Sequence, residues 1–235
     1  MLIFFDTEFT GLVPNTSLIS IGMVSADGYK FYGEFLDYDA NLCTDWIKEN
    51  VISNCLIDIS KKDGLQKQFD YIESLSQLYG KQRDIRNLYS VYMTREKYDI
   101  YTKMAEDDKL TISIGPTSVV TEALTNWLKH WKIQPIQLVS DVCHYDMELF
   151  CGLFGGAMNL PDNVTPVCFD ICQDIALNYN EINNVTDSLS VRMHNAFDIS
   201  REDLCVRLGQ ELPEGIKHNS LYDAEIIKLI FEGLH

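Results

Sequence analysis

Two carboxylates near the start of the chain are the first residues whose types and spacing suggest chemistry. Asp6 and Glu8 directly follow the apolar run Leu2–Phe5 in the stretch "LIFFDTEF". Alternate side chains of a strand share one face, so both carboxylates are expected to point the same way. Two neighbouring negative charges repel unless a cation lies between them, and oxygen ligands suit Mg²⁺. The pair therefore predicts a divalent metal site, although taken alone the polar end of a buried strand is the commoner explanation.

A second group of candidate residues lies in the stretch "HNSLYDAEIIKLI". His218 precedes an expected helix, and Asp223 lies in the first turn of that helix. Across a helix start the two side chains can converge on one cleft, as a metal ligand with a neighbouring general base. The structural alternative is helix capping, because Ser220 and Asp223 have capping-box spacing and acids favour a helix N-terminus.

The third group follows an expected buried strand in "LVSDVCHYDMELFCGLFGG". It offers Asp141, His144, Asp146 and Glu148. Sites in α/β sheets gather at the carboxyl ends of strands, so this position suits a ligand. At most one or two of the four need a function, and the structural alternative has Asp141 capping the helix and the other acids facing solvent.

The elements that must position these residues begin with three extended stretches. Leu2–Phe5, Leu18–Ser25 and Tyr29–Leu36 are joined by short turns, and Asp27-Gly28 is a strong hairpin signal. A short helix is expected from Asp45 to Val51. Later helices are expected over 117–131, 145–154, 200–209 and 220–231, the last of them ended by Gly233, and short strands over 135–140 and 166–170. This order predicts an α/β fold whose mixed sheet has three antiparallel strands followed by parallel strands, flanked by helices.

The length and charge distribution favour one domain with an insertion. The chain has 235 residues, which fits a single domain over 1–235. Residues 55–110 carry apolar side chains at helical intervals and are predicted to be a helical insertion within that domain. Residues 58–110 hold ten of the 19 Lys and Arg residues and ten acids, so this block is neutral within a chain of net charge −16.

Composition narrows the classes of function. The net charge of −16 argues against a broad nonspecific duplex binder, which needs many phosphate contacts. No apolar run approaches the roughly 18 residues of a membrane span, and the first residues lack the basic segment of a signal peptide. The seven cysteines include no C-x-x-C pair and are expected to be reduced thiols. These features predict a cytoplasmic protein without a membrane partner.

Three stretches together resemble a known family. "FFDTEFTGL…LISIG", "CHYDMELFCGLFG" and "HNSLYDAE" resemble the three motifs of the DEDDh 3′–5′ exonucleases of the ribonuclease-H-like superfamily, and look most like small stand-alone 3′–5′ exoribonucleases. The likeness covers about residues 1–50 and 110–235. Asp146 matches the third acid of the family, with Asp141 as the alternative. "HNAFD" at 194–198 imitates the second motif of the wider superfamily, but it follows the Asp146 region and is interpreted as a coincidence.

The resemblance implies a two-metal phosphodiester hydrolase. In that interpretation Asp6, Glu8, Asp146 and Asp223 hold two divalent metal ions, Mg²⁺ or Mn²⁺. His218 acts as the general base that takes the proton from the attacking water, since its ordinary pKa of about 6.5 suits that role.

The resemblance also implies the substrate and its contacts. The substrate would be single-stranded RNA or DNA, or a 3′ overhang, shortened from its 3′ end to nucleoside 5′-monophosphates, with RNA slightly favoured. Phe9, Thr10, Gly11 and Leu12 would bind the terminal nucleotide. A homodimer stays open, because relatives of this kind are often dimers.

Two other functions compete with the exonuclease. A ribonuclease-H-like endonuclease is disfavoured because the His218–Asp223 pairing resembles exonucleases. A catalytically inactive acidic binding module is disfavoured because all four acids and the histidine are present.

Overall fold

The computed structural model describes residues 1–57 and 93–235. Most of the expected insertion, residues 58–92, lies outside the described residues. Within the described part of 55–110, a helix spans Arg95–Met104 (α4) and a strand spans Leu110–Gly115 (β4). The strand was not predicted; only its first residue, Leu110, falls within the expected helical insertion.

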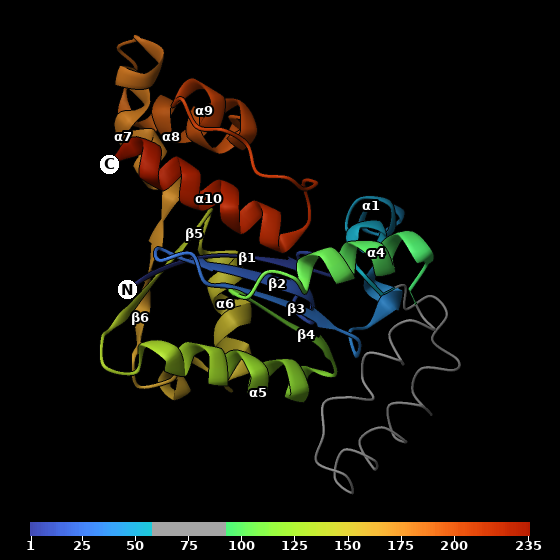
Figure 1. Ribbon diagram of the computed structural model, residues 1–235. Coiled ribbons are helices and arrows are strands. Elements are labelled where there is room, and N and C mark those ends of the chain that lie inside the picture. The colour runs from blue at the N-terminus through green and yellow to red at the C-terminus, as the bar shows by residue number, and fades with distance from the viewer. Residues whose placement is uncertain (58–92) are drawn as a thin grey trace, which may run out of the picture.

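One six-stranded mixed sheet forms the centre of the described chain (Figure 1). Its order is β4-β3-β2-β1-β5-β6, where the strands span Leu2–Phe9 (β1), Leu18–Ser25 (β2), Lys30–Phe35 (β3), Leu110–Gly115 (β4), Ile136–Ser140 (β5) and Val164–Asp170 (β6). The first three strands are antiparallel neighbours. The pairs β3–β4, β1–β5 and β5–β6 are parallel. The α/β class and the change from antiparallel to parallel pairing are thus confirmed.

Helices cover both faces of the sheet, as Figure 1 shows. They span Asp45–Asn50 (α1), Arg95–Met104 (α4), Thr117–Leu128 (α5), His144–Leu153 (α6), Ile171–Asn183 (α7), Leu189–Asp198 (α8), Arg201–Arg207 (α9) and Ser220–Leu234 (α10). The helix α10 crosses one face, while α5 and α6 lie on the other. The prediction that Gly233 ends the last helix is wrong, because α10 continues to Leu234.

The pleat of β1 divides its side chains between two hydrophobic cores. Phe4 packs with Val139 and with residues of α7, α9 and α10. Phe5 packs on the opposite side, with residues of α5 and α6. Because strand side chains alternate, Asp6 and Glu8 share the α10 face with Phe4. Packing on both faces therefore holds β1 in place, and the alternation of its side chains directs both carboxylates toward α10.

A glycine in β2 allows α10 to lie directly against the sheet. A Cβ atom at Gly22 would overlap the backbone of Ser220 and Leu221. The contact is completed by a hydrogen bond between the hydroxyls of Ser220 and Ser20, 3.0 Å apart. This close approach brings the N-terminal turn of α10 over the middle of the sheet, next to the carboxylates of β1.

Two further observations concern the whole described chain. All seven cysteines are free thiols, as expected. Over residues 1–57 and 93–235, no helix has the length and apolar character that crossing a bilayer requires.

Candidate active site

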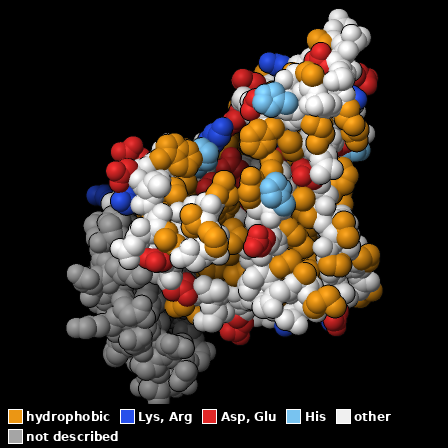
Figure 2. Space-filling model, turned by 180° about the vertical axis from the view of Figure 1, so that it is seen from behind, with side chains coloured by type: hydrophobic (Ala, Val, Ile, Leu, Met, Phe, Trp, Pro, Cys, Tyr) orange, Lys and Arg blue, Asp and Glu red, His pale blue; other side chains and the backbone are white. Residues whose placement is uncertain are grey.

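A cleft of about 540 Å³ collects the residues that the sequence singled out. Its walls come from β1, from the segment between β5 and α6, from the turn between α8 and α9, and from the start of α10. Figure 2 shows acidic side chains recessed in a hollow of this face, with hydrophobic side chains around it. Asp6, Glu8, Asp146, His218 and Asp223 all line the cleft.

The two carboxylates lie on β1, where alternate side chains share one face, as expected. The strand runs to Phe9, four residues beyond the apolar run Leu2–Phe5. Pairing with β2 continues through Glu8, which lies opposite Ser20, and a bulge follows between Glu8 and Phe9. Both acids are therefore held by a hydrogen-bonded ladder on a rigid element.

His218 lies in an unusual backbone conformation at the start of α10. Its φ angle is 63°, in the left-handed region. Its backbone N–H donates to Asp223 Oδ2 at 2.8 Å. The side chain that caps the helix is Asn219, whose Oδ1 accepts from the backbone N–H groups of Leu221 and Tyr222. The proposed Ser220–Asp223 capping box is wrong, because Asn219 is the cap and Asp223 reaches back to His218.

Three ligand-type side chains form the tightest group in the cleft. One ligand atom each from Glu8, His218 and Asp223 lies within 4.8 Å of the other two. The imidazole Nδ1 of His218 is 3.8 Å from Glu8 Oε1. These residues come from opposite ends of the chain and meet because α10 packs on β1 and β2.

Asp146 lies beside this group rather than within it. Its Oδ1 accepts from the backbone N–H of Thr7 at 3.0 Å and from the Thr7 hydroxyl at 2.5 Å. Its Oδ2 accepts from the Ser140 hydroxyl at 2.5 Å. Thr7 alternates with Asp6 and Glu8, so Asp146 is bonded to the opposite face of β1.

Asp141, the alternative third acid, has a cationic partner. Its two oxygens accept from Arg201 Nε and Nη2 at 2.6 and 2.8 Å. Arg201 also donates to the carbonyls of Ala196 and Ile199 at the end of α8. The expectation that Asp141 caps α6 is wrong, because its carboxylate ties the α8–α9 turn to the end of β5. Asp146, by contrast, accepts only from neutral donors.

Burial and mutual repulsion raise the pKa values of the four carboxyl groups. Burial raises the pKa of Glu8 to about 8, and the charges of Asp223 and Asp146 add to the rise. Burial likewise raises the pKa of Asp223 to about 7 and that of Asp146 to about 6. The pKa of Asp6 lies well above its ordinary value, again because of burial and then of its acidic neighbours. The cleft thus gathers more acidic groups than the basic groups of the described residues neutralise.

The histidine is shifted in the opposite direction. Burial, and then the charge of Lys217, lower the pKa of His218 below its ordinary value. The ring is therefore neutral near pH 7 and is available to accept a proton. This is the protonation state that a general base requires.

Of the four expected substrate contacts, only Phe9 lines the cleft. Thr10 is fully buried, and its hydroxyl accepts from the backbone N–H of Ser17 at 3.0 Å. Gly11 and Leu12 follow in the turn, where Leu12 is exposed. Thr10 thus shapes the β1–β2 turn instead of presenting its side chain to the cleft.

Aromatic residues around the cleft were missed by sequence reasoning. Tyr145 and Phe197 line it, and both are exposed. The ring of Trp46 meets the His218 ring edge-on, with centroids 5.0 Å apart. Exposed aromatic side chains leave no periodic signal, although Phe197 belongs to the "HNAFD" stretch that was set aside. Asp198 of that stretch also lines the cleft, but it is exposed and pairs with His194 at 3.4 Å.

The sequence matches no protein-family model and no curated protein. The chemistry of the donor set is therefore the basis for assigning what the cleft binds. Carboxylate oxygens suit hard divalent cations such as Mg²⁺ and Mn²⁺, and imidazole suits the softer of these. The four carboxyl groups with raised pKa values fit a site that a divalent cation would stabilise in its ionised form.

Proposed function

We propose that this chain is a metal-dependent 3′–5′ exonuclease with a ribonuclease-H-like fold, acting on single-stranded RNA or DNA or on a 3′ overhang. The observation that carries the proposal is the group formed by Glu8, His218 and Asp223 in one cleft. Asp6 and Asp146 line the same cleft, so four acids and one histidine are available together.

The residues that would hold two divalent ions follow from their positions. Glu8 and Asp223 would hold one ion, Asp146 would support the other, and Asp6, which lies among them, would contribute to both. When bound, such ions polarise the scissile phosphate and stabilise the negative charge of the attacking and leaving oxygens.

The protein supplies the general base and the rigid frame. His218, neutral near pH 7, accepts the proton of the attacking water. Its Nδ1 is the ring nitrogen that faces Glu8, 3.8 Å away, and is therefore placed to take the proton on the carboxylate side of the cleft. Cleavage leaves the phosphate on the departing 3′-terminal nucleotide, so each turnover releases a nucleoside 5′-monophosphate.

The walls of the cleft support an unpaired 3′ end as the substrate. Phe9, Tyr145 and Phe197 line a volume of about 540 Å³. Aromatic side chains bind unpaired bases by stacking, without a need for sequence-specific contacts. The likeness to exoribonucleases favours RNA over DNA.

A cleavage assay tests the proposal. The protein is incubated with 5′-labelled single-stranded RNA or DNA, in Mg²⁺, in Mn²⁺ or in chelator. We expect a metal-dependent ladder that shortens from the 3′ end, lost in Asp6→Ala. The matched control is Asp162→Asn, which changes an exposed acid outside the cleft and should cleave as the wild type does.

Other outcomes decide for other functions. Internal cuts, most clearly in an RNA–DNA hybrid, would indicate a ribonuclease-H-like endonuclease instead of an exonuclease. Folded protein that cleaves none of these substrates in either metal would indicate an inactive acidic binding module. Cleavage that persists in Asp6→Ala would remove the site described here from the reaction.

A further inference from the structure

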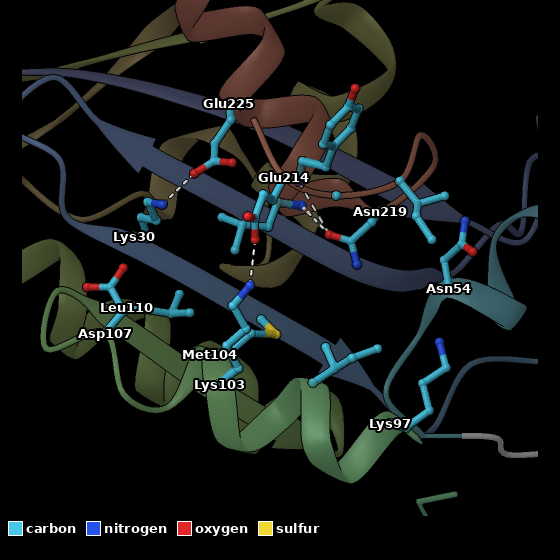
Figure 3. Close-up of a pocket in the computed structure, with 15 residues that line it drawn as sticks. Lys30, Asn54, Lys97, Lys103, Met104, Asp107, Leu110, Glu214, Asn219 and Glu225 are labelled. Carbon is cyan, nitrogen blue, oxygen red and sulfur yellow. Dashed lines mark hydrogen bonds and ion pairs between the residues drawn. The ribbon is translucent and has the colours of Figure 1, made fainter. Parts of the chain in front are cut away.

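The turn that carries His218 separates two cavities. Lys217 and His218 line the candidate active site, whereas Asn219 lines a second cavity of about 430 Å³. Figure 3 shows this second cavity between α4 and the start of α10, with Lys103 directed toward Glu214. Lys103 Nζ and Glu214 Oε2 are 2.5 Å apart. The 217–219 turn therefore lies between the candidate active site and this second cavity.

Two side chains hold the residues on either side of His218. Asn54 Nδ2 donates to the carbonyl oxygen of Lys217 at 2.9 Å. Asn219 Nδ2 donates to the hydroxyl of Tyr32 at 3.3 Å. Trp46, which lies in α1, contacts the His218 ring itself. A non-glycine residue with positive φ persists where its surroundings fix it, and these contacts supply that constraint.

A buried glutamate connects these holding groups. Glu34 in β3 is 1% exposed and lies outside the cleft. One of its oxygens accepts from the Tyr32 hydroxyl at 2.7 Å and from the backbone N–H of Leu56 at 2.5 Å. The other accepts from the backbone N–H of Ile57 at 3.0 Å. The carboxylate thus fastens the segment that follows Asn54 to the tyrosine that contacts Asn219.

The groups of this network do not line the cleft, so they do not contact a substrate there directly. A buried carboxylate is costly unless donors satisfy it, and all three donors to Glu34 are neutral groups. Its evident effect is to join residues 56–57, Tyr32 and Asn219 into one unit. That unit holds the turn on one side of His218. On the other side, the backbone N–H of His218 donates to Asp223.

We propose that Tyr32 and Asn54 are positioning residues that hold the 217–219 turn so that the His218 ring faces the carboxylates of the cleft. The inference rests on the proposed role of His218 as general base. It assigns a function to a buried polar network that the reaction itself does not use. It also predicts that Tyr32 and Asn54 influence turnover although neither lines the candidate active site.

Two variants test the positioning by kinetics. Tyr32→Phe keeps the ring in the core and removes the hydroxyl, and Asn54→Ala removes the donor to Lys217. Each should lower kcat by on the order of tenfold, because small misplacements of a catalytic group cost factors of this size. KM for a single-stranded substrate should stay within about twofold, because neither residue lines the cleft. The matched control is Tyr29→Phe, which removes a tyrosine hydroxyl remote from the turn and should leave kcat unchanged.

A spectroscopic readout separates this inference from the proposed function. The Cε1–H resonance of His218 should be shifted by the nearby Trp46 ring and should show a nuclear Overhauser contact to it. In both variants the resonance should move and the contact should weaken, whether or not the wild type cleaves nucleic acid. Wild-type inactivity would contradict the exonuclease alone. An unchanged resonance and an unchanged kcat in folded Tyr32→Phe and Asn54→Ala would overturn the positioning role.

Discussion

Glu8→Gln should make the metal-free protein more stable at neutral pH, although it removes a proposed metal ligand. The folded-state pKa of Glu8 is about 8, raised from 4.5 by burial and by the charges of Asp223 and Asp146. Between these two pH values the folded state binds more protons than the unfolded state. The free energy of unfolding therefore falls as the pH rises through that window.

The size of the effect follows from the same values. One pKa unit corresponds to about 1.4 kcal/mol, so the raised pKa of Glu8 lowers the free energy of unfolding by about 3 kcal/mol at pH 7 and by less than about 1 kcal/mol at pH 5. Glutamine has nearly the same shape and no charge. For a chain of this size, about 2 to 3 kcal/mol corresponds to a Tm increase of roughly 4–12 °C.

Thermal unfolding in chelator at pH 5 and pH 7 measures this directly. Glu8→Gln should melt above the wild type at pH 7, with the difference within about 3 °C at pH 5. The exposed control Asp162→Asn should follow the wild type at both values, since such surface changes stay within about 0.5 kcal/mol. A saturating divalent cation should raise the wild-type Tm more than that of Glu8→Gln, because a ligand stabilises only the state that binds it. If Glu8→Gln melts below the wild type in chelator at pH 7, the repulsion argument for the cleft is wrong.

Three further predictions concern other contacts of the structure. Asp141→Ala should lower the free energy of unfolding by about 3 kcal/mol in urea, because it leaves the largely buried charge of Arg201 without its carboxylate partner, and it should leave cleavage per folded molecule unchanged. If Asp141→Ala keeps its urea midpoint and loses cleavage, Asp141 is the third acid after all. Gly22→Ala should cost about 3 kcal/mol because its Cβ would overlap the first turn of α10, and an unchanged urea midpoint would contradict that close contact. Phe197→Ala should raise KM by roughly 5–150-fold with little change in kcat, since stacking of one base contributes about 1–3 kcal/mol, and an equal KM would exclude Phe197 from substrate binding.

The strands that carry the site were accessible from the sequence because their signals are local. The bounds of β2 were predicted at Leu18–Ser25, as observed. The Asp27-Gly28 turn was predicted as well, and Gly28 has the φ of 87° that its turn requires. For β1 the apolar run ends at Phe5, and Asp6 and Glu8 were expected at the polar end of the same strand. The ladder continues to Phe9, since main-chain pairing with β2 does not depend on the polarity of the side chains.

The strand β4 and the helices α7 and α8 were not predicted from the sequence. The helix α8 has Leu189, Met193 and Phe197 at helical spacing, but only Ala196 of this helix is buried. The strand β4 is the edge of the sheet and buries only its last three residues, so its alternation of buried and exposed side chains is weak. The helix α7 does carry a readable pattern, because Ile171, Cys172, Ile175 and Ala176 are spaced for one helical face.

Within the site, residue types were predictable and partnerships were not. Asp141 and Asp146 are five residues apart, have the same chemistry and line the same cleft. The difference between them is Arg201, which lies 60 residues beyond Asp141 and pairs with it through two hydrogen bonds. No local pattern contains that contact, because it forms when α9 packs against the end of β5. An acid whose charge is already matched by a guanidinium has less to offer a metal ion than one held by hydroxyl and amide donors. The cationic partner, rather than the spacing of the acids, is therefore the feature that distinguishes the two.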